Sequence, residues 1–152
     1  MKKVVILSTG FLFVLLACGK NKFNTRPSLT LKSLSSTNLP VNGDLRIDLE
    51  FTDKEGDISD SIFLKRIRTN QAQVPVNLDT FGFAVPSYPE KPKGEITLLL
   101  NYQLHVIAAL NPPLEGNPPT PVPDTIVFKI ALRDKAGNKS DTVTTDPIIV
   151  AR

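Results

Sequence analysis

Apolar side chains recur at every second position in three long stretches of this sequence. Between positions 44 and 51, Leu, Ile, Leu and Phe alternate with Asp, Arg, Asp and Glu. Residues 95–109 and 125–133 follow the same period. A helix would spread these apolar residues around its circumference, whereas a strand separates them onto a core face and a solvent face. The alternation therefore predicts β-strands that each bury one face.

Weaker segments of the same kind complete a set of seven expected strands, at about 28–34, 44–52, 61–68, 79–85, 95–108, 124–134 and 141–151. Turn-forming Gly and Asn residues separate several of them. The alternation slips near Lys65, which predicts a bulge, and Pro147 predicts an edge position or a bulge for the last strand. No amphipathic helix is expected in residues 18–152. The pattern predicts an all-β fold, an antiparallel β-sandwich.

A proline-rich stretch, residues 111–124, separates the fifth and sixth expected strands. Six of its positions are proline, and proline lacks the amide donor that a sheet needs. We therefore expect an extended connection outside the sheets. It serves either as a stiff surface loop or as a docking segment for an aromatic groove on a partner.

The N-terminus carries the pattern of an export signal. Lys2 and Lys3 precede an apolar run, Val4 to Ala17, that is shorter than the ~20 residues needed to span a membrane. The run ends at Leu15-Leu16-Ala17-Cys18-Gly19, which resembles the lipobox of bacterial lipoprotein precursors. The resemblance implies cleavage before Cys18, the only cysteine, and attachment of fatty-acid chains such as palmitate to it. More than one chain is needed for a stable anchor.

The resemblance to lipoproteins implies a signal peptide at 1–17. The polar, basic composition that follows predicts a tether at 18–27, and the strand pattern predicts one domain at 28–152. The same resemblance implies a lipid-anchored protein of the cell envelope, and Gly19 after the cysteine favours the outer membrane where the organism has two. Without Lys2 and Lys3 the chain has 16 basic and 15 acidic residues. This balance argues against nucleic acid as a partner. The expected partners are the membrane, through Cys18, and an envelope protein or glycan.

Two acidic loops follow the second and sixth expected strands, at 53–60 and 134–141. Their sequences, Asp-Lys-Glu-Gly-Asp-Ile-Ser-Asp and Asp-Lys-Ala-Gly-Asn-Lys-Ser-Asp, resemble turns of Ig-like and cadherin-like modules. In an immunoglobulin-type sandwich the corresponding loops lie at one end. Calcium binds six to eight oxygen ligands. The residues expected to converge on such an ion are Asp53, Glu55, Asp57, Asp60, Asp134, Asn138 and Asp141.

The alternative is that both acidic loops are ordinary polar turns. Asp, Asn and Gly are favoured in turns because they tolerate unusual backbone angles and bind their own amides. In that case Lys54, Lys135 and Lys139 would balance the acidic charges without a metal.

The sequence contains no recognisable catalytic motif, so we expect no enzyme. The single histidine, His105, has the parity of the solvent face of its expected strand. A non-catalytic binding or structural module is the leading interpretation. The alternative is an accessory ligand-binding lipoprotein, for glycan capture or uptake, with Tyr88 as the exposed aromatic residue of its binding face.

Overall fold

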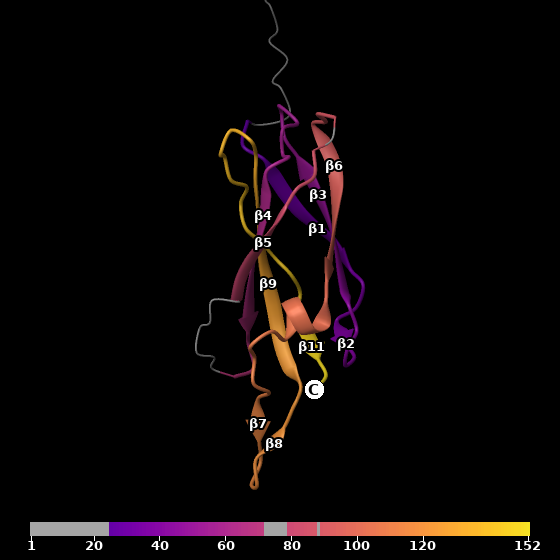
Figure 1. Cartoon of the computed structure of the whole chain (residues 1–152), viewed down its shortest axis with the longest axis vertical. Coiled ribbons are helices and arrows are strands. Elements are labelled where there is room, and N and C mark those ends of the chain that lie inside the picture. The colour runs from indigo at the N-terminus through magenta and orange to yellow at the C-terminus, as the bar shows by residue number, and fades with distance from the viewer. Residues whose placement is uncertain (1–24, 72–78, 88) are drawn as a thin grey trace, which may run out of the picture.

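The computed structural model describes residues 25–71, 79–87 and 89–152, and in it the alternating stretches form strands (Figure 1). In β3 (Leu45–Thr52) the four apolar residues are buried, and the charged residues between them face outward. β9 (Asp124–Arg133) has the same alternation. The prediction that the alternating stretches form strands with one buried face is therefore confirmed.

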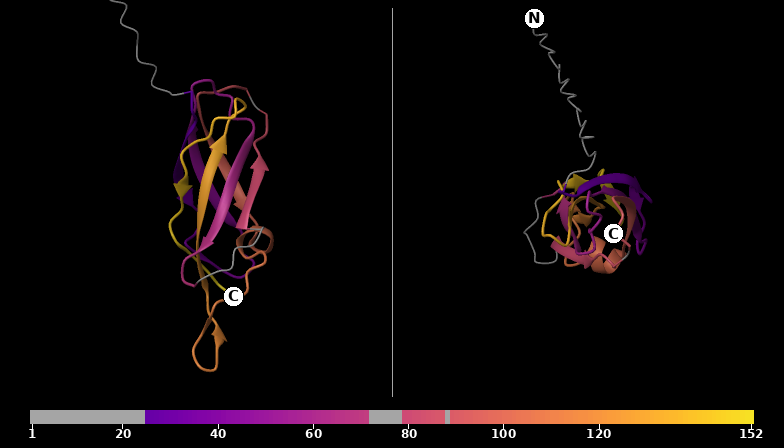
Figure 2. Two further views of the ribbon diagram at one scale, coloured as in Figure 1. Left: turned by 90° about the vertical axis from the view of Figure 1, so that its left-hand side faces the viewer. Right: turned by 90° about the horizontal axis from the view of Figure 1, so that it is seen from above.

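The strands form two main sheets that face each other (Figure 2). The smaller sheet is antiparallel, in the order β1–β3–β6, with β1 at Ser28–Leu34 and β6 at Lys93–Leu100. The larger sheet has the order β2–β11–β9–β4–β5, and β10 also pairs with β9. Its other strands are β2 (Asn38–Leu39), β4 (Ser61–Arg68), β5 (Thr80–Ala84), β10 (Val143–Thr144) and β11 (Ile148–Val150). The all-β, antiparallel sandwich is thus confirmed, with one parallel pairing, between β11 and β2.

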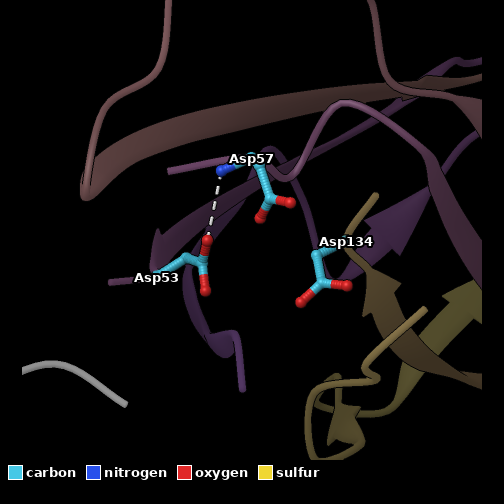
Figure 3. Close-up of side chains that lie close together, drawn as sticks. All are labelled: Asp53, Asp57 and Asp134. Carbon is cyan, nitrogen blue, oxygen red and sulfur yellow. Dashed lines mark hydrogen bonds between the residues drawn. The ribbon is translucent and has the colours of Figure 1, made fainter. Parts of the chain in front are cut away.

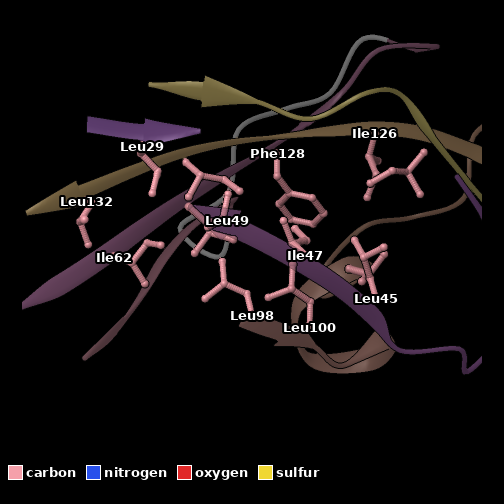
Figure 4. Packing of buried hydrophobic residues seen from close by; sticks show 14 of the residues in the cluster. Leu29, Leu45, Ile47, Leu49, Ile62, Leu98, Leu100, Ile126, Phe128 and Leu132 are labelled. Atoms are coloured by element: carbon pink, nitrogen blue, oxygen red, sulfur yellow. The ribbon is translucent and has the colours of Figure 1, made fainter. Parts of the chain in front are cut away.

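The core lies between the two sheets and is built from their inward positions (Figure 4). β3 and β9 contribute four buried apolar side chains each, and β4, β6 and β11 contribute two each. Burial of one such side chain contributes about 1.5–3 kcal/mol to folding. Since the sequence has a single cysteine, this packing has no help from disulfides within the chain. The side chains labelled in Figure 4 are Leu29, Leu45, Ile47, Leu49, Ile62, Leu98, Leu100, Ile126, Phe128 and Leu132.

The prediction of one long strand at 95–108 is wrong for the second half of that range. β6 ends at Leu100, and a π-helix, η2 (Tyr102–Val106), follows it. The Asn101 side chain accepts hydrogen bonds from the backbone N–H groups of Gln103 and Leu104, so it caps the helix at its start. The sequence pattern predicts no amphipathic helix in residues 18–152, and it does not reveal this single helical turn.

Two further details of the strands differ from expectation. β4 pairs with β5 and β9 without any shift in register, so the bulge predicted near Lys65 is wrong. A register shift lies instead in β1, between Leu31 and Ser33. The last expected strand is divided into β10 and β11, with Pro147 in the gap. β11 is not at an edge, because β2 covers its outer side.

The proline-rich stretch lies outside the two main sheets, as expected, but it is not wholly extended. It contains a small hairpin of β7 (Leu114–Glu115) and β8 (Thr120–Pro121), which projects from one end of the sandwich (Figure 1). The turn between them includes Gly116 at φ +88° and the cis Asn117–Pro118 bond.

The two ends of the sandwich differ in the segments they carry. We call one the entry end: it holds Arg26 and the loops 53–60, 89–93 and 134–141. We call the other the far end: it holds η2, the β7–β8 hairpin and the C-terminus (Figure 1). Within the described ranges, no helix has the length and apolar character needed to cross a membrane.

Candidate metal centre

The two acidic loops meet at the entry end. The backbone N–H of Lys135 donates to the carbonyl of Asp57, over 3.0 Å, which joins the second loop to the first. Gly56 adopts φ +72° and packs so closely on the backbone of Lys91 that a Cβ there would lie 2.6 Å from its nitrogen. Only glycine fits this position without strain. The predicted proximity of the two loops is therefore confirmed.

Three carboxylates from these loops converge: those of Asp53, Asp57 and Asp134 (Figure 3). One oxygen from each lies within 4.8 Å of the others. A calcium ion lies 2.3–2.6 Å from each of its ligands, so its ligand oxygens are at most about 5 Å apart. The three oxygens therefore fit around one such ion.

Two of the three carboxylates, those of Asp53 and Asp134, are held in place by their own loops. Asp53 Oδ2 accepts hydrogen bonds from the backbone N–H of Gly56, at 2.8 Å, and of Asp57, at 3.2 Å. Asp134 accepts from the backbone N–H of Asn138 at 2.7 Å and from its side-chain amide at 2.9 Å. These bonds are typical of an Asx turn. They leave lone pairs on the same oxygens for an ion.

The burial of this cluster is what separates it from an ordinary polar turn. Asp53 is 0% exposed and Asp134 is 1% exposed. Asp53 Oδ1 is buried and accepts no hydrogen bond. Burial raises the pKa of the Asp53 carboxyl, and the neighbouring Asp57 carboxyl raises this pKa further. A buried, unpartnered carboxylate oxygen is costly unless it is paired or coordinates a metal.

No basic side chain of the described residues balances the cluster. None of the salt bridges involves Asp53, Asp57 or Asp134. The lysines expected to neutralise the loops, Lys54 and Lys135 among them, are exposed. Neutralisation by these lysines, which the ordinary-turn interpretation offered, is therefore not seen at the three carboxylates of the described structure.

Of the other four residues predicted for the site, Asn138 contacts the cluster only as a donor to Asp134, and Glu55, Asp60 and Asp141 lie outside the convergent group. Glu55 is exposed, and Asn138 donates to Asp134 instead of presenting its oxygen to the cluster. Asp60 pairs with Arg133, which lowers the pKa of the Asp60 carboxyl. Asp141 pairs with Arg26 at 2.9 Å. The predicted set of seven is therefore reduced to three side chains, and main-chain carbonyls or water would complete the coordination.

His105 does not face solvent from a strand, contrary to expectation. It lies half-buried in η2, where its Nδ1 accepts a hydrogen bond from the backbone N–H of Asn101 at 2.9 Å. Its ring packs against Phe81 and Phe83, with centroids 5.4 Å away in both cases. These contacts explain the residue as part of the packing of η2. Cys18, the rest of the proposed signal segment and Tyr88 lie outside the described residues.

A second feature, a pocket of about 610 Å³, was not foreseen from the sequence. It lies between β5 and β6, which are edge strands of the two sheets, and Phe51 and Ile62 line its inner side. Its lining is mostly apolar, including Phe83 and Leu98. Sequence reasoning missed it because alternation identifies the inward face of a strand but not which strands end up at the edges.

Comparison with known proteins adds little to this geometry. No protein-family model and no curated protein matches the chain. Among solved structures, the chain is similar to a beta-glucosidase from Listeria innocua in complex with gluconolactone, at 12% identity and a TM-score of 0.42. It is also similar to Spo0M, a sporulation control protein from Bacillus subtilis, at 11% identity and a TM-score of 0.38. These matches cover 83% and 84% of this chain, but only 16% of the first protein and 50% of the second.

Proposed function

We propose that this chain is a lipid-anchored protein of the cell envelope, most simply of the outer membrane, whose β-sandwich is a non-catalytic binding or structural module stabilised by calcium. The observation that supports the calcium part is the cluster of Asp53, Asp57 and Asp134, which has no basic partner among the described residues and in which Asp53 and Asp134 are buried. Calcium would be held by these carboxylates and would offset the repulsion between them. The lipobox resemblance at Cys18 supports the anchor.

The role of calcium in this proposal is structural. The ion would join the 53–60 loop to the 134–141 loop, which already share the Lys135–Asp57 hydrogen bond. Because calcium binds the folded arrangement and not the unfolded chain, the free energy of unfolding would rise with the logarithm of the calcium concentration above the dissociation constant. The entry end would then be a rigid base for the rest of the module.

The anchor is tested by intact mass of the chain extracted from membranes. The expected product begins at Cys18 and carries the added mass of a diacylglycerol and a further acyl chain. Because Cys18 is the only cysteine, a maleimide should label the Cys18→Ala variant and the acylated chain equally poorly. A wild-type chain with a free, labelled thiol at position 18 would contradict the proposal.

The pocket between β5 and β6 favours a second candidate, an accessory ligand-binding lipoprotein. Its apolar lining, with Phe83 and Val85 on one side and Ile96 on the other, suits an apolar ligand better than a glycan. Fluorescence of anilinonaphthalene sulfonate, an apolar probe, tests this candidate. Binding that is lost in Phe83→Glu but kept in Leu114→Glu, an exposed residue of the hairpin, would support it. Binding lost in neither variant would count against it.

A further inference from the structure

The entry end carries a set of exposed lysines that have no acidic partner. Lys54, Lys91, Lys135 and Lys139 are all exposed, and none takes part in a salt bridge of the described chain. By contrast, Arg26 at the same end is paired with Asp141. We call these four residues the lysine rim.

The lysine rim is one surface because the loops that carry it touch each other. Lys135 is bonded through its backbone to Asp57 of the first loop, and Gly56 of that loop packs on the backbone of Lys91. The carbonyl of Lys139 accepts a hydrogen bond from the Arg26 side chain. Arg26 lies two residues before the start of β1, so this contact places Lys139 beside the point where the chain enters the sandwich.

Charge at this end is divided between an inner and an outer layer. The acids Asp53 and Asp134 are buried, whereas the four lysines of the rim point to solvent. Two exposed acids at this end, Glu55 and Glu90, have no ion pair among the described residues. A bound calcium ion would cancel two of the three charges of the cluster, so the four lysines would outnumber the three negative charges that remain unpaired at this end.

We propose that the lysine rim docks on the anionic headgroups of the membrane that holds the lipid anchor, and that calcium in the adjacent cluster strengthens this docking. The inference rests on the proposed function, since it takes both the anchor and the ion from it. Six residues, 19–24, lie between the acylated cysteine and Thr25, and this stretch of chain spans at most about 24 Å. Two of them, Lys20 and Lys22, add further positive charge.

Docking of this kind would fix the orientation of the molecule. Each lysine near an anionic surface contributes roughly 1 kcal/mol, and the effect fades beyond a Debye length of about 8 Å. The tether is long enough for the rim to reach the headgroups, and contact with them brings the lysines within that range. The far end, with its β7–β8 hairpin, would then point away from the membrane and be free to meet a partner.

Amide hydrogen exchange of the acylated chain in nanodiscs tests the proposal. In discs of equal parts phosphatidylglycerol and phosphatidylcholine with calcium, exchange in the loops 53–60, 89–93 and 134–141 should be about fivefold slower or more than in pure phosphatidylcholine. Exchange in the β7–β8 hairpin should not change. The charge-reversed variant Lys135→Glu/Lys139→Glu should lose the difference.

A matched variant controls for net charge. Lys65 and Lys129 are exposed, unpaired and opposite each other on the outer face of the larger sheet, so Lys65→Glu/Lys129→Glu changes the charge equally without touching the rim. It should behave as the wild type. Equal exchange in the two kinds of disc, or equal loss in both variants, would overturn the proposal.

The same samples distinguish the inference from the proposed function. A chain whose intact mass shows no acylation will not be retained in the discs, and the proposed anchor falls with it. An acylated chain with unprotected loops overturns the docking alone. Loop protection that persists unchanged in a chelator overturns the coupling to calcium.

Discussion

Two carboxylates of this protein are equally buried but have opposite surroundings. Asp124, near the far end, is 0% exposed and forms salt bridges with Arg68 and Arg152. Asp53, at the entry end, is also 0% exposed, but its charged neighbours are two further acids. One site contains its own counterions, and the other contains only like charges.

The difference shows which buried carboxylate finds its counterion within the described chain and which does not. A buried charge is tolerated when it is paired and hydrogen-bonded, as Asp124 is. Arg66 is likewise buried, with Asp79 as its partner and with backbone carbonyls of η2 accepting from its guanidinium. The Asp53 cluster has no such partner in the described chain. We therefore infer that the missing cation comes from solution.

Loss of the Asp124 charge should give the largest effect. The variant Asp124→Asn keeps the shape of the side chain but leaves Arg68 and Arg152, with side chains 6% and 11% exposed, without a counterion. We expect a loss of about 3–5 kcal/mol in the free energy of unfolding. Urea denaturation measures it, and the loss should be the same with calcium and with chelator. A loss below about 1 kcal/mol would show that the pair is not needed.

The same substitution at Asp53 should act in the opposite way. With free calcium at a hundredfold excess over its dissociation constant, the wild type should gain about 2.7 kcal/mol over the chelated form. Asp53→Asn should lose this gain, because the cluster loses one charged ligand. In chelator the variant should be at least as stable as the wild type, since its amide can donate to the carboxylates beside it. If Asp53→Asn is destabilised equally with calcium and in chelator, Asp53 does not differ from Asp124 in its dependence on calcium.

The dependence of stability on pH sharpens the comparison. The folded pKa of Asp53 is raised above its usual 3.8, so without calcium the folded state binds this proton more tightly than the unfolded state does. The contribution of Asp53 to stability in chelator is therefore present below pH 3.8 and is lost as the pH rises through the raised pKa. The pKa of Asp60 is lowered by Arg133. Its contribution to stability is therefore present above pH 3.8 and is lost as the pH falls through the lowered pKa.

The contribution of Asp53 is isolated by subtracting the unfolding free energy of Asp53→Asn from that of the wild type across this pH range. In chelator the difference should fall as the pH rises. With calcium bound it should rise instead, because the ion binds the carboxylate form. A difference that does not depend on pH in chelator would mean that burial leaves this carboxyl unperturbed.

The smallest effect is expected at an exposed acid of the same end. Asp141 pairs with Arg26, and both side chains are more than half exposed. Asp141→Asn should change the free energy of unfolding by no more than about 0.5 kcal/mol, since exposed ion pairs contribute little. Its response to calcium should equal that of the wild type. A lost calcium response would place Asp141 among the ligands.

The strands could be predicted from the sequence because their apolar residues alternate with charged ones. The prediction was wrong after Leu100, where Tyr102 and Val106 fit both a strand and a helical turn. Leu104, between them, is 71% exposed, so the helical spacing is the correct one. Asn101 as a helix cap was the available signal. The bulge at Lys65 was wrong because a local slip in alternation does not determine how neighbouring strands pair.

The acidic loops could also be located from the sequence, and so could their meeting at one end. What could not be predicted was which acids turn inward. Asp60 forms an ion pair with Arg133, and Asp141 forms one with Arg26. Both arginines are distant in sequence from the acid that they pair with. Such pairings depend on the finished fold. The pocket between β5 and β6 depends on it too.

Calorimetric titration of the chelator-treated protein with calcium tests the central claim most directly. We predict one ion bound per wild-type chain and no binding heat for Asp53→Asn, while the surface variant Asp141→Asn binds as the wild type does. Absence of binding by the wild type at millimolar calcium, or the same binding by Asp53→Asn, would contradict it.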